Sequence, residues 1–132
     1  MTDLPSTDDQ RREAGMRTRR EVLGHAHVDR AVAGTTPFTA DFQDFITRVA
    51  WGDIWQRPGL ARRDRSLLTL AITIALRHWD EFALHVRAAV NNGLTDAEIA
   101  EVIQHAAVYA GVPAANHAFA VARPILEELR RT

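Results

Sequence analysis

The sequence of 132 residues contains no cysteine and no lysine. Without cysteine the chain has no disulfide, no thiolate nucleophile and no cysteine-ligated zinc or iron–sulfur site. Without lysine it has neither a Schiff-base nucleophile nor the lysine of a phosphate-binding loop. All 16 basic residues are arginine, whose side chain can hold a carboxylate through two parallel hydrogen bonds. Genome composition alone also explains the missing lysine, and we favour that explanation.

Long runs of like charge and long apolar runs are missing as well. The formal net charge is -1, and the apolar (46%) and charged (25%) fractions are ordinary for a globular protein. We therefore expect no nucleic-acid and no membrane partner. The longest apolar run, residues 67–76, is too short to span a bilayer, and residues 1–15 lack the apolar segment of a signal peptide. These features predict a soluble, cytoplasmic protein.

The length predicts one domain, residues 13–132, after a mobile tail at residues 1–12. Helical spacing and stop signals predict helices from Thr7 or Asp8 to Leu23, over about 38–54, from a capping box at residues 95–98, and from about 114 to the end. Residues 62–77 contain β-branched residues that suit a strand, but their length and the lack of a partner strand favour a helix. We predict an all-α, compact bundle of about six helices. Its apolar helices and three tryptophans favour a homo-oligomer.

Three polar residues share one edge of the helix that we expect over residues 79–90, before the stop signal Asn91-Asn92-Gly93. At about 100° per residue, His78, Glu81 and His85 fall within an arc of about 60°, beside an apolar stripe. A pocket at such an edge is half dry, which suits proton transfer by histidine and glutamate. Two other interpretations stay open. The trio can be structural, or it can bind a metal if a second helix supplies a ligand.

Other polar and aromatic residues have simpler interpretations. Arg57 precedes Pro58-Gly59 at a fixed loop position, where it can hold a carboxylate or lie at the surface. Arg30 follows the histidines of a turn that is typically solvated. Trp51 and Trp55 share one helix face, which is typical of a core or an interface.

The order of several motifs is more specific than any one of them. The chain reads HVDR at 27–30, TPF at 36–38, WGDIWQRPGL at 51–60, RDRSLLTLA at 63–71, LHVRAAVNNG at 84–93 and YAGVPAAN at 109–116. This combination, over about residues 16–128, resembles the carboxymuconolactone decarboxylase family. The resemblance implies an alkylhydroperoxidase-like helical fold in a ring-like homo-oligomer, a hexamer or trimer.

Redox members of the wider family carry a Cys-x-x-Cys-x-x-x-His motif on the corresponding helix. Here His78 and Glu81 stand at the two cysteine positions, His85 keeps the histidine position, and Ser66 replaces a glutamate. Thiol chemistry is therefore excluded, and the resemblance to the decarboxylase branch is strengthened. The catalytic roles of the redox members do not transfer to His78 and Glu81.

The resemblance implies decarboxylation of 4-carboxymuconolactone to β-ketoadipate enol-lactone and CO2, without cofactor or metal, in protocatechuate catabolism. On this hypothesis His85 donates the proton, Glu81 orients it and His78 assists. The substrate-binding candidates are Arg57, Arg30, Ser66 and Trp51. Two alternatives remain: a related enzyme for another small carboxylated ring or a quinone-like compound, and a non-catalytic helical oligomer that binds a ligand.

Overall fold

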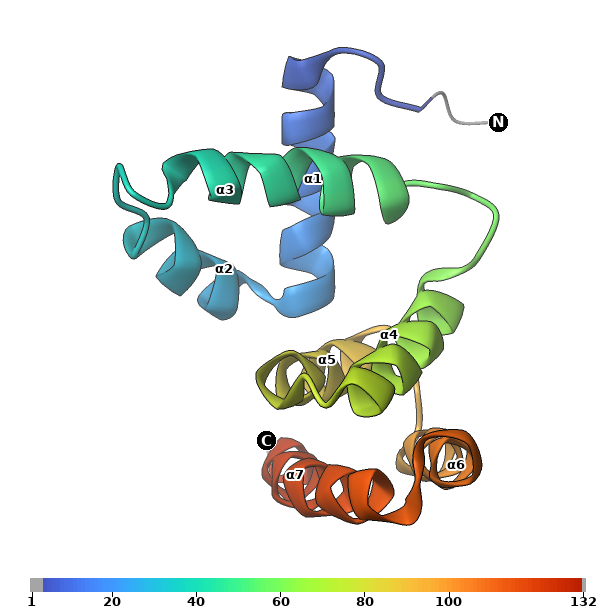
Figure 1. Ribbon diagram of the computed structural model, residues 1–132. Coiled ribbons are helices and arrows are strands. Elements are labelled where there is room, and N and C mark those ends of the chain that lie inside the picture. The colour runs from blue at the N-terminus through green and yellow to red at the C-terminus, as the bar shows by residue number, and fades with distance from the viewer. Residues whose placement is uncertain (1–3, 132) are drawn as a thin grey trace. The chain divides into compact units, whose positions relative to one another are not determined.

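The computed structural model describes residues 4–131, and every regular element in that range is helical (Figure 1). There are seven α-helices and one π-helical segment: α1 (Asp8–Leu23), α2 (His25–Ala33), α3 (Ala40–Ile46), η1 (Thr47–Ile54), α4 (Arg62–Leu76), α5 (Trp79–Asn91), α6 (Asp96–Ala110) and α7 (Val112–Arg130). The all-α prediction is confirmed, including the helix at residues 62–77. The expected count of about six is low, because α2 was interpreted as a solvated turn, whereas α3 and η1 together form the one helix that was predicted over about 38–54.

The chain divides into two units, Met1–Ala61 and Arg62–Thr132. The prediction of one domain at 13–132 stays a prediction. Part of the predicted tail at residues 1–12 is helical, because α1 already begins at Asp8. Of the two residues expected to cap α1, Thr7 does so. Its hydroxyl accepts a hydrogen bond from the Gln10 backbone nitrogen, and the Gln10 side chain accepts one from the Thr7 backbone nitrogen. Residues 1–3 lie outside the described part.

The first unit is built around a close crossing of α1 and η1. Gly15 of α1 lies against η1 so closely that a Cβ there would clash with the carbonyl oxygen of Thr47 and lie 2.8 Å from the backbone nitrogen of Gly52. Gly52 has the matching restriction, because a Cβ there would clash with the carbonyl oxygen of Arg11 and lie 3.0 Å from its carbonyl carbon. The two backbones can approach this closely because neither residue has a side chain.

Polar contacts fix the same crossing at either end. Arg11 grips Asp53 with two parallel hydrogen bonds, from Nε at 2.8 Å and from Nη2 at 2.7 Å. The Gln56 side chain donates to the carbonyl oxygens of Ala14 and Trp51, each at 3.1 Å, and contacts the Thr18 hydroxyl. These contacts hold η1 and the residues after it against α1.

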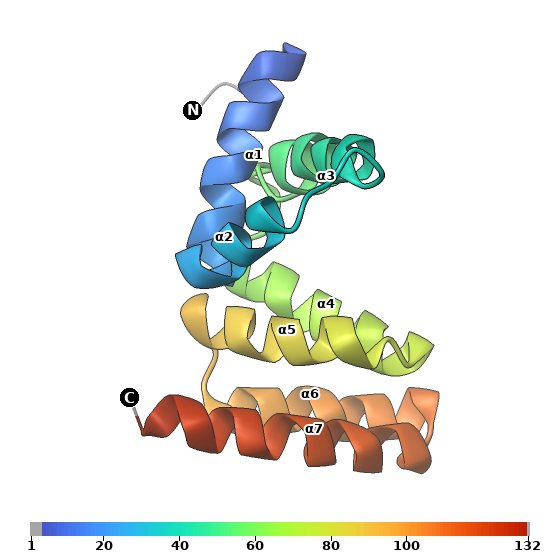
Figure 2. The ribbon, with the colours of Figure 1, turned by 90° about the vertical axis from the view of Figure 1, so that its left-hand side faces the viewer.

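The second unit is a bundle of α4, α5, α6 and α7 around one apolar core. α4 packs on α5 and α6, and α7 packs on α5 and α6; Figure 2 shows α6 and α7 side by side below the α4–α5 pair. Its largest fully buried side chains are Leu70, Ile74, Phe82, Val86, Ile99 and Ile103. The stop signal predicted at residues 91–93, where α5 ends, and the capping box Thr95–Glu98 at the start of α6 are both confirmed.

Among residues 4–131, none of the helices combines the length and the apolar character that a membrane span requires.

Candidate active site

The predicted trio follows α5 from solvent into the core. His78 is the residue before the first turn, with φ −85° and ψ 77°, and its side chain makes no capping hydrogen bond. Glu81 lies in the first turn, where a negative charge is stabilised by the helix dipole. Both side chains are exposed. His85 is buried, with 7% of its surface exposed. The trio therefore shares a helix edge, but only His85 is sheltered.

His85 lies among apolar neighbours of its own helix. Phe82, Val86 and Ala89 are each completely buried, and the Nδ1 atom of His85 is shielded from solvent. A neutral imidazole has one nitrogen that donates and one that accepts, so it can pass a proton. Shelter from water is the environment that a proton-transfer group in a dry site needs. The position is compatible with catalysis and equally with a structural role.

Ser66 lies on α4 and is completely buried. Its hydroxyl oxygen accepts a hydrogen bond of 2.8 Å from Nδ2 of Asn92, the residue that caps the end of α5. The pair therefore ties the first turns of α4 to the last turn of α5. A role for Ser66 at a substrate oxygen stays a prediction. The sequence analysis did not identify Asn92 as a partner of Ser66, because the Asn-Asn-Gly stop signal already explains an asparagine at this position.

The remaining candidates belong to the first unit. Trp51 is buried on η1, and its ring centroid lies 5.1 Å from that of Trp55. Arg57 is exposed in the segment after η1, where its backbone nitrogen donates to the carbonyl oxygen of Ile54 at 3.2 Å. Arg30 is exposed on α2 and takes part in none of the ion pairs found between residues 4 and 131. α5 with its neighbour α4 thus carries four of the seven candidates, and the first unit carries three.

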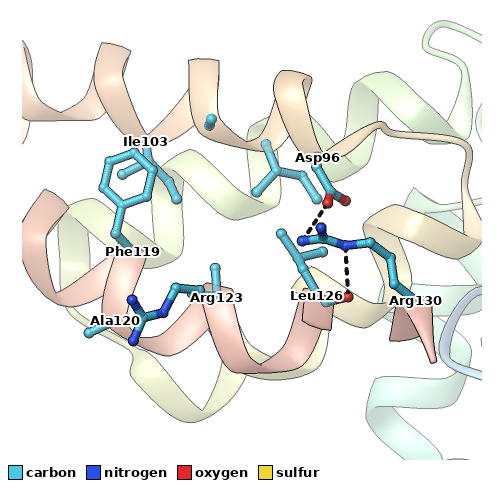
Figure 3. A pocket seen from close by; sticks show the side chains of 10 residues that line it. Asp96, Ile103, Phe119, Ala120, Arg123, Leu126 and Arg130 are labelled. Carbon is cyan, nitrogen blue, oxygen red and sulfur yellow. Dashed lines mark hydrogen bonds and ion pairs between the residues drawn. The ribbon is translucent and has the colours of Figure 1, made fainter. Parts of the chain in front are cut away.

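Three cavities of the second unit lie away from the catalytic candidates on α5. One of 370 Å³ opens between α6 and α7, where the Asp96–Arg130 ion pair of 2.9 Å closes one end and Phe119 faces Ile103 (Figure 3). The other two, of 430 and 400 Å³, lie between α4 and α6 and share Ala71 and His105. None of the three has His78, Glu81 or His85 in its lining.

A metal site built by these helices is not found. Within the described part of the chain, no three histidine, aspartate or glutamate side chains are grouped so that they would hold an ion. Zinc and iron sites in proteins take at least three such ligands when cysteine is lacking.

Sequence reasoning missed one charged residue of the interior. Arg19 on α1 has 5% of its surface exposed and is the one buried arginine among residues 4–131. Nothing in its local sequence indicates this burial, because Arg19 is followed by Arg20 in a segment rich in charge. The burial depends on packing against residues 24 and 28 positions further along the chain.

The sequence also matches a known family model. Residues 40–124 match the model described as the carboxymuconolactone decarboxylase family, which covers the chain from the start of α3 into α7. The chain belongs to this family. Arg19 and Arg30 precede the matched segment, whereas Trp51, Arg57, Ser66 and the trio on α5 lie within it.

Curated relatives extend the match over almost the whole chain. A 4-carboxymuconolactone decarboxylase of Acinetobacter baylyi is 47% identical over 122 residues, which are 92% of this chain and 91% of the relative. A nitrosuccinic acid decarboxylase of Metarhizium robertsii is 45% identical over 117 residues, 89% of this chain and 82% of the relative. A 4-carboxymuconolactone decarboxylase sequence of Pseudomonas putida is 54% identical over 44 residues, 33% of this chain and 92% of that sequence. The carboxymuconolactone decarboxylase family member described here is a decarboxylase, a carboxy-lyase, and not merely a binding protein.

Proposed function

We propose that this family member decarboxylates 4-carboxymuconolactone to β-ketoadipate enol-lactone and CO2 in the cytoplasmic catabolism of protocatechuate. One observation carries the proposal: the 47% identity to the Acinetobacter enzyme of that name spans more than nine-tenths of both chains.

The substrate proposed here is its own electron sink. The bond between the ring carbon and the departing carboxylate breaks, and its electron pair moves through the conjugated double bond into the lactone carbonyl. CO2 leaves, and an enolate with its charge on the carbonyl oxygen remains. Protonation of the carbon beside the carbonyl then gives the product. The reaction needs no external electron acceptor, so the protein has to position the substrate, stabilise the enolate oxygen and deliver a proton.

We assign proton delivery to His85 and the orientation of His85 to Glu81. The two residues are four positions apart on α5, which places them on one helix face. His78 or Ser66 would donate to the enolate oxygen, and Arg57 or Arg30 would hold the carboxylate that is retained. Trp51 would contribute to substrate binding. The burial of His85 supports the first assignment, since a positioned general acid in a dry site typically accelerates a reaction by about 10²–10⁴-fold.

The test is turnover of purified lactone by the His85→Ala variant, followed through the lactone absorbance. We expect kcat to fall by about 10²-fold or more while the circular dichroism spectrum is unchanged. His25→Ala, which replaces an exposed histidine of α2, is the matched control and should keep its activity. Near-normal turnover by folded His85→Ala would remove His85 from the mechanism. Arg57→Ala and Arg30→Ala should raise KM; an unchanged KM in both would place the carboxylate elsewhere.

A second substrate is favoured by one observation, the 45% identity to the nitrosuccinic acid decarboxylase of Metarhizium robertsii. Nitrosuccinic acid also has a carboxylate next to an electron-withdrawing group, so the same positions can serve both reactions. The two are separated by measuring kcat/KM for both acids with one preparation. We expect the lactone to be preferred, and a higher kcat/KM for nitrosuccinic acid would reassign the substrate.

We also propose that the chain forms a homo-oligomer of three or six copies. Large apolar side chains are exposed on the α4 and α6 surface, among them Ile72 (55%), Val108 (78%) and Tyr109 (81%). Exposed apolar groups that lie together in this way are typical of interfaces. Sedimentation should show a single species of three or six chains, and Ile72→Glu should dissociate it. A monomer in the unsubstituted protein would contradict the proposal.

A further inference from the structure

Arg19 carries a charge into the interior of the first unit, where none of the acidic side chains of residues 4–131 pairs with it. Its Nη1 donates to the Thr47 hydroxyl at 3.3 Å and its Nη2 donates to Oε1 of Gln43 at 3.1 Å. Both acceptors are neutral. The third nitrogen, Nε, is shielded from solvent and makes no hydrogen bond within the described chain. Arg19 takes part in none of the ion pairs among residues 4–131.

Such a charge is costly to bury. A guanidinium has five N–H donors, and the contacts of Arg19 use two of them. Burial lowers the pKa of Arg19, and the neighbouring charge of Arg20 lowers it further. A buried charge is ordinarily paired with an opposite charge, because its lost hydration is not recovered otherwise. A negatively charged group bound at Arg19 would therefore compensate a buried charge that the described residues leave unpaired.

A small cavity lies at the same place. Its volume is ≈ 140 Å³, and Arg19, Gln43 and Thr47 are all part of its wall. The rest of the lining is Arg12, Met16, Val32, Thr35 and Asp44. Pockets that enclose whole drug-sized ligands measure about 300–1,000 Å³. The space at Arg19 is therefore suited to a single functional group or a very small acid.

The one acidic residue in the wall does not serve Arg19. Asp44 is bound by Arg12 through Nε at 2.5 Å and by Arg48 through Nε at 2.7 Å, so its charge is already compensated. The choice of occupant therefore rests on size and shape and not on repulsion by Asp44, because a planar carboxylate group needs less of the ≈ 140 Å³ than a tetrahedral phosphate or sulfate. A carboxylate carries one charge, and its two oxygens match the parallel N–H donors of a guanidinium.

We propose that Arg19, Gln43 and Thr47 form a subsite in the first unit that binds one carboxylate group of a small organic acid. Arg19 supplies the charge and the fork of donors. The Gln43 amide nitrogen adds a neutral donor. The Thr47 hydroxyl has a fixed direction, since it donates to the backbone carbonyl oxygen of Gln43 at 2.8 Å while it accepts from Arg19. The proposal does not rest on the proposed function, which assigns carboxylate binding to Arg57 or Arg30.

The direct test is equilibrium dialysis of the full-length protein against radiolabelled acetate, with chloride used to keep the ionic strength constant. We expect one acetate per chain, with half-saturation in the millimolar range, and displacement by unlabelled acetate or succinate. Sulfate at the same ionic strength should displace at least ten-fold less effectively. Wild-type protein that shows no saturable binding would overturn the proposal, and so would equally effective displacement by sulfate.

Variants locate the site. Arg19→Lys keeps the charge but removes the fork, and should weaken acetate binding at least ten-fold; Arg19→Gln should abolish it. Arg17→Gln is the matched control, because Arg17 is exposed on the same helix. If the Arg19 variants do not fold, Gln43→Leu provides the same information at a partly buried neutral residue, with an expected weakening of several-fold. Equal binding by the control and by every folded variant of the subsite would place the acetate elsewhere.

Discussion

The crossing of α1 and η1 allows a strong test, because it has no room for a single methyl group. A Cβ on Gly15 would meet the carbonyl oxygen of Thr47, the backbone nitrogen of Gly52 at 2.8 Å and the Cα of Gly52 at 3.1 Å. All three atoms belong to the backbone of η1, so no side chain can rotate away. Relief requires that the two helices move apart, which also disturbs the Arg11–Asp53 pair.

The expected magnitude for Gly15→Ala follows from two opposing effects. Alanine is favoured over glycine inside a helix by about 0.5–1 kcal/mol. Overpacking a close contact typically costs about 1–3 kcal/mol, and a clash with backbone lies at the upper end. We therefore expect a net loss of about 1–2 kcal/mol in the free energy of unfolding. For a chain of this size, that loss lowers Tm by about 2–16 °C.

The assay is urea unfolding of Gly15→Ala, followed by circular dichroism at one fixed protein concentration, because association would make the apparent stability depend on concentration. Gly59→Ala is the matched control, since a Cβ at Gly59 has no atom within 4 Å. The control should unfold within about 0.5 kcal/mol of wild type. If Gly15→Ala unfolds at the wild-type midpoint, the close approach of the two backbones is wrong.

Three further predictions concern single contacts. Ser66→Ala should lower the free energy of unfolding by about 1–3 kcal/mol in urea titrations, because it leaves the Asn92 amide without its buried acceptor; the double variant with Asn92→Ala should lose less than the sum of the two. Thr95→Ala should cost about 0.5–2 kcal/mol in the same assay, because it removes the capping box of α6. Arg12 and Arg48 lower the pKa of Asp44 from 3.8 to about 2, so the stabilisation by the charged carboxylate is complete above pH 4 and is lost as the pH falls towards 2. Asp44→Asn should flatten that part of the acid unfolding curve, and an unchanged slope would contradict the pairing.

The sequence predicted those elements whose signals are local. The capping residues Thr7 and Thr95 and the stop at residues 91–93 act within one turn of the helix ends that they mark. The π-helical form of residues 47–54 had no such signal, because it accompanies the crossing at Gly15, some 30 positions earlier in the chain. Likewise, the spacing of Phe38 and Phe42 indicated a helix face, but both side chains are exposed in the single chain. The periodicity of apolar residues identifies an apolar helix face, but it does not identify the part of the protein that packs on that face.

The candidate site was predictable to the same degree. Helical periodicity placed His78, Glu81 and His85 on one edge, and it did so without indicating that His85 alone is sheltered. That difference comes from the depth at which each turn of α5 enters the bundle. The contact between Ser66 and Asn92, 26 positions apart, also required the packing of α4 on α5.

The arginines show why composition alone is a weak guide to function. All 16 basic residues are arginine, yet most are surface residues whose ion pairs are each worth about 0–1 kcal/mol. The preference for arginine over lysine therefore says little about ligands at those positions. Arg19 is different because its side chain is buried and pairs with no acidic side chain among residues 4–131. In such surroundings a carboxylate gains far more from the charge than it does at the exposed Arg30 or Arg57. The argument for an acid-binding role thus rests on one buried residue and not on the sixteen.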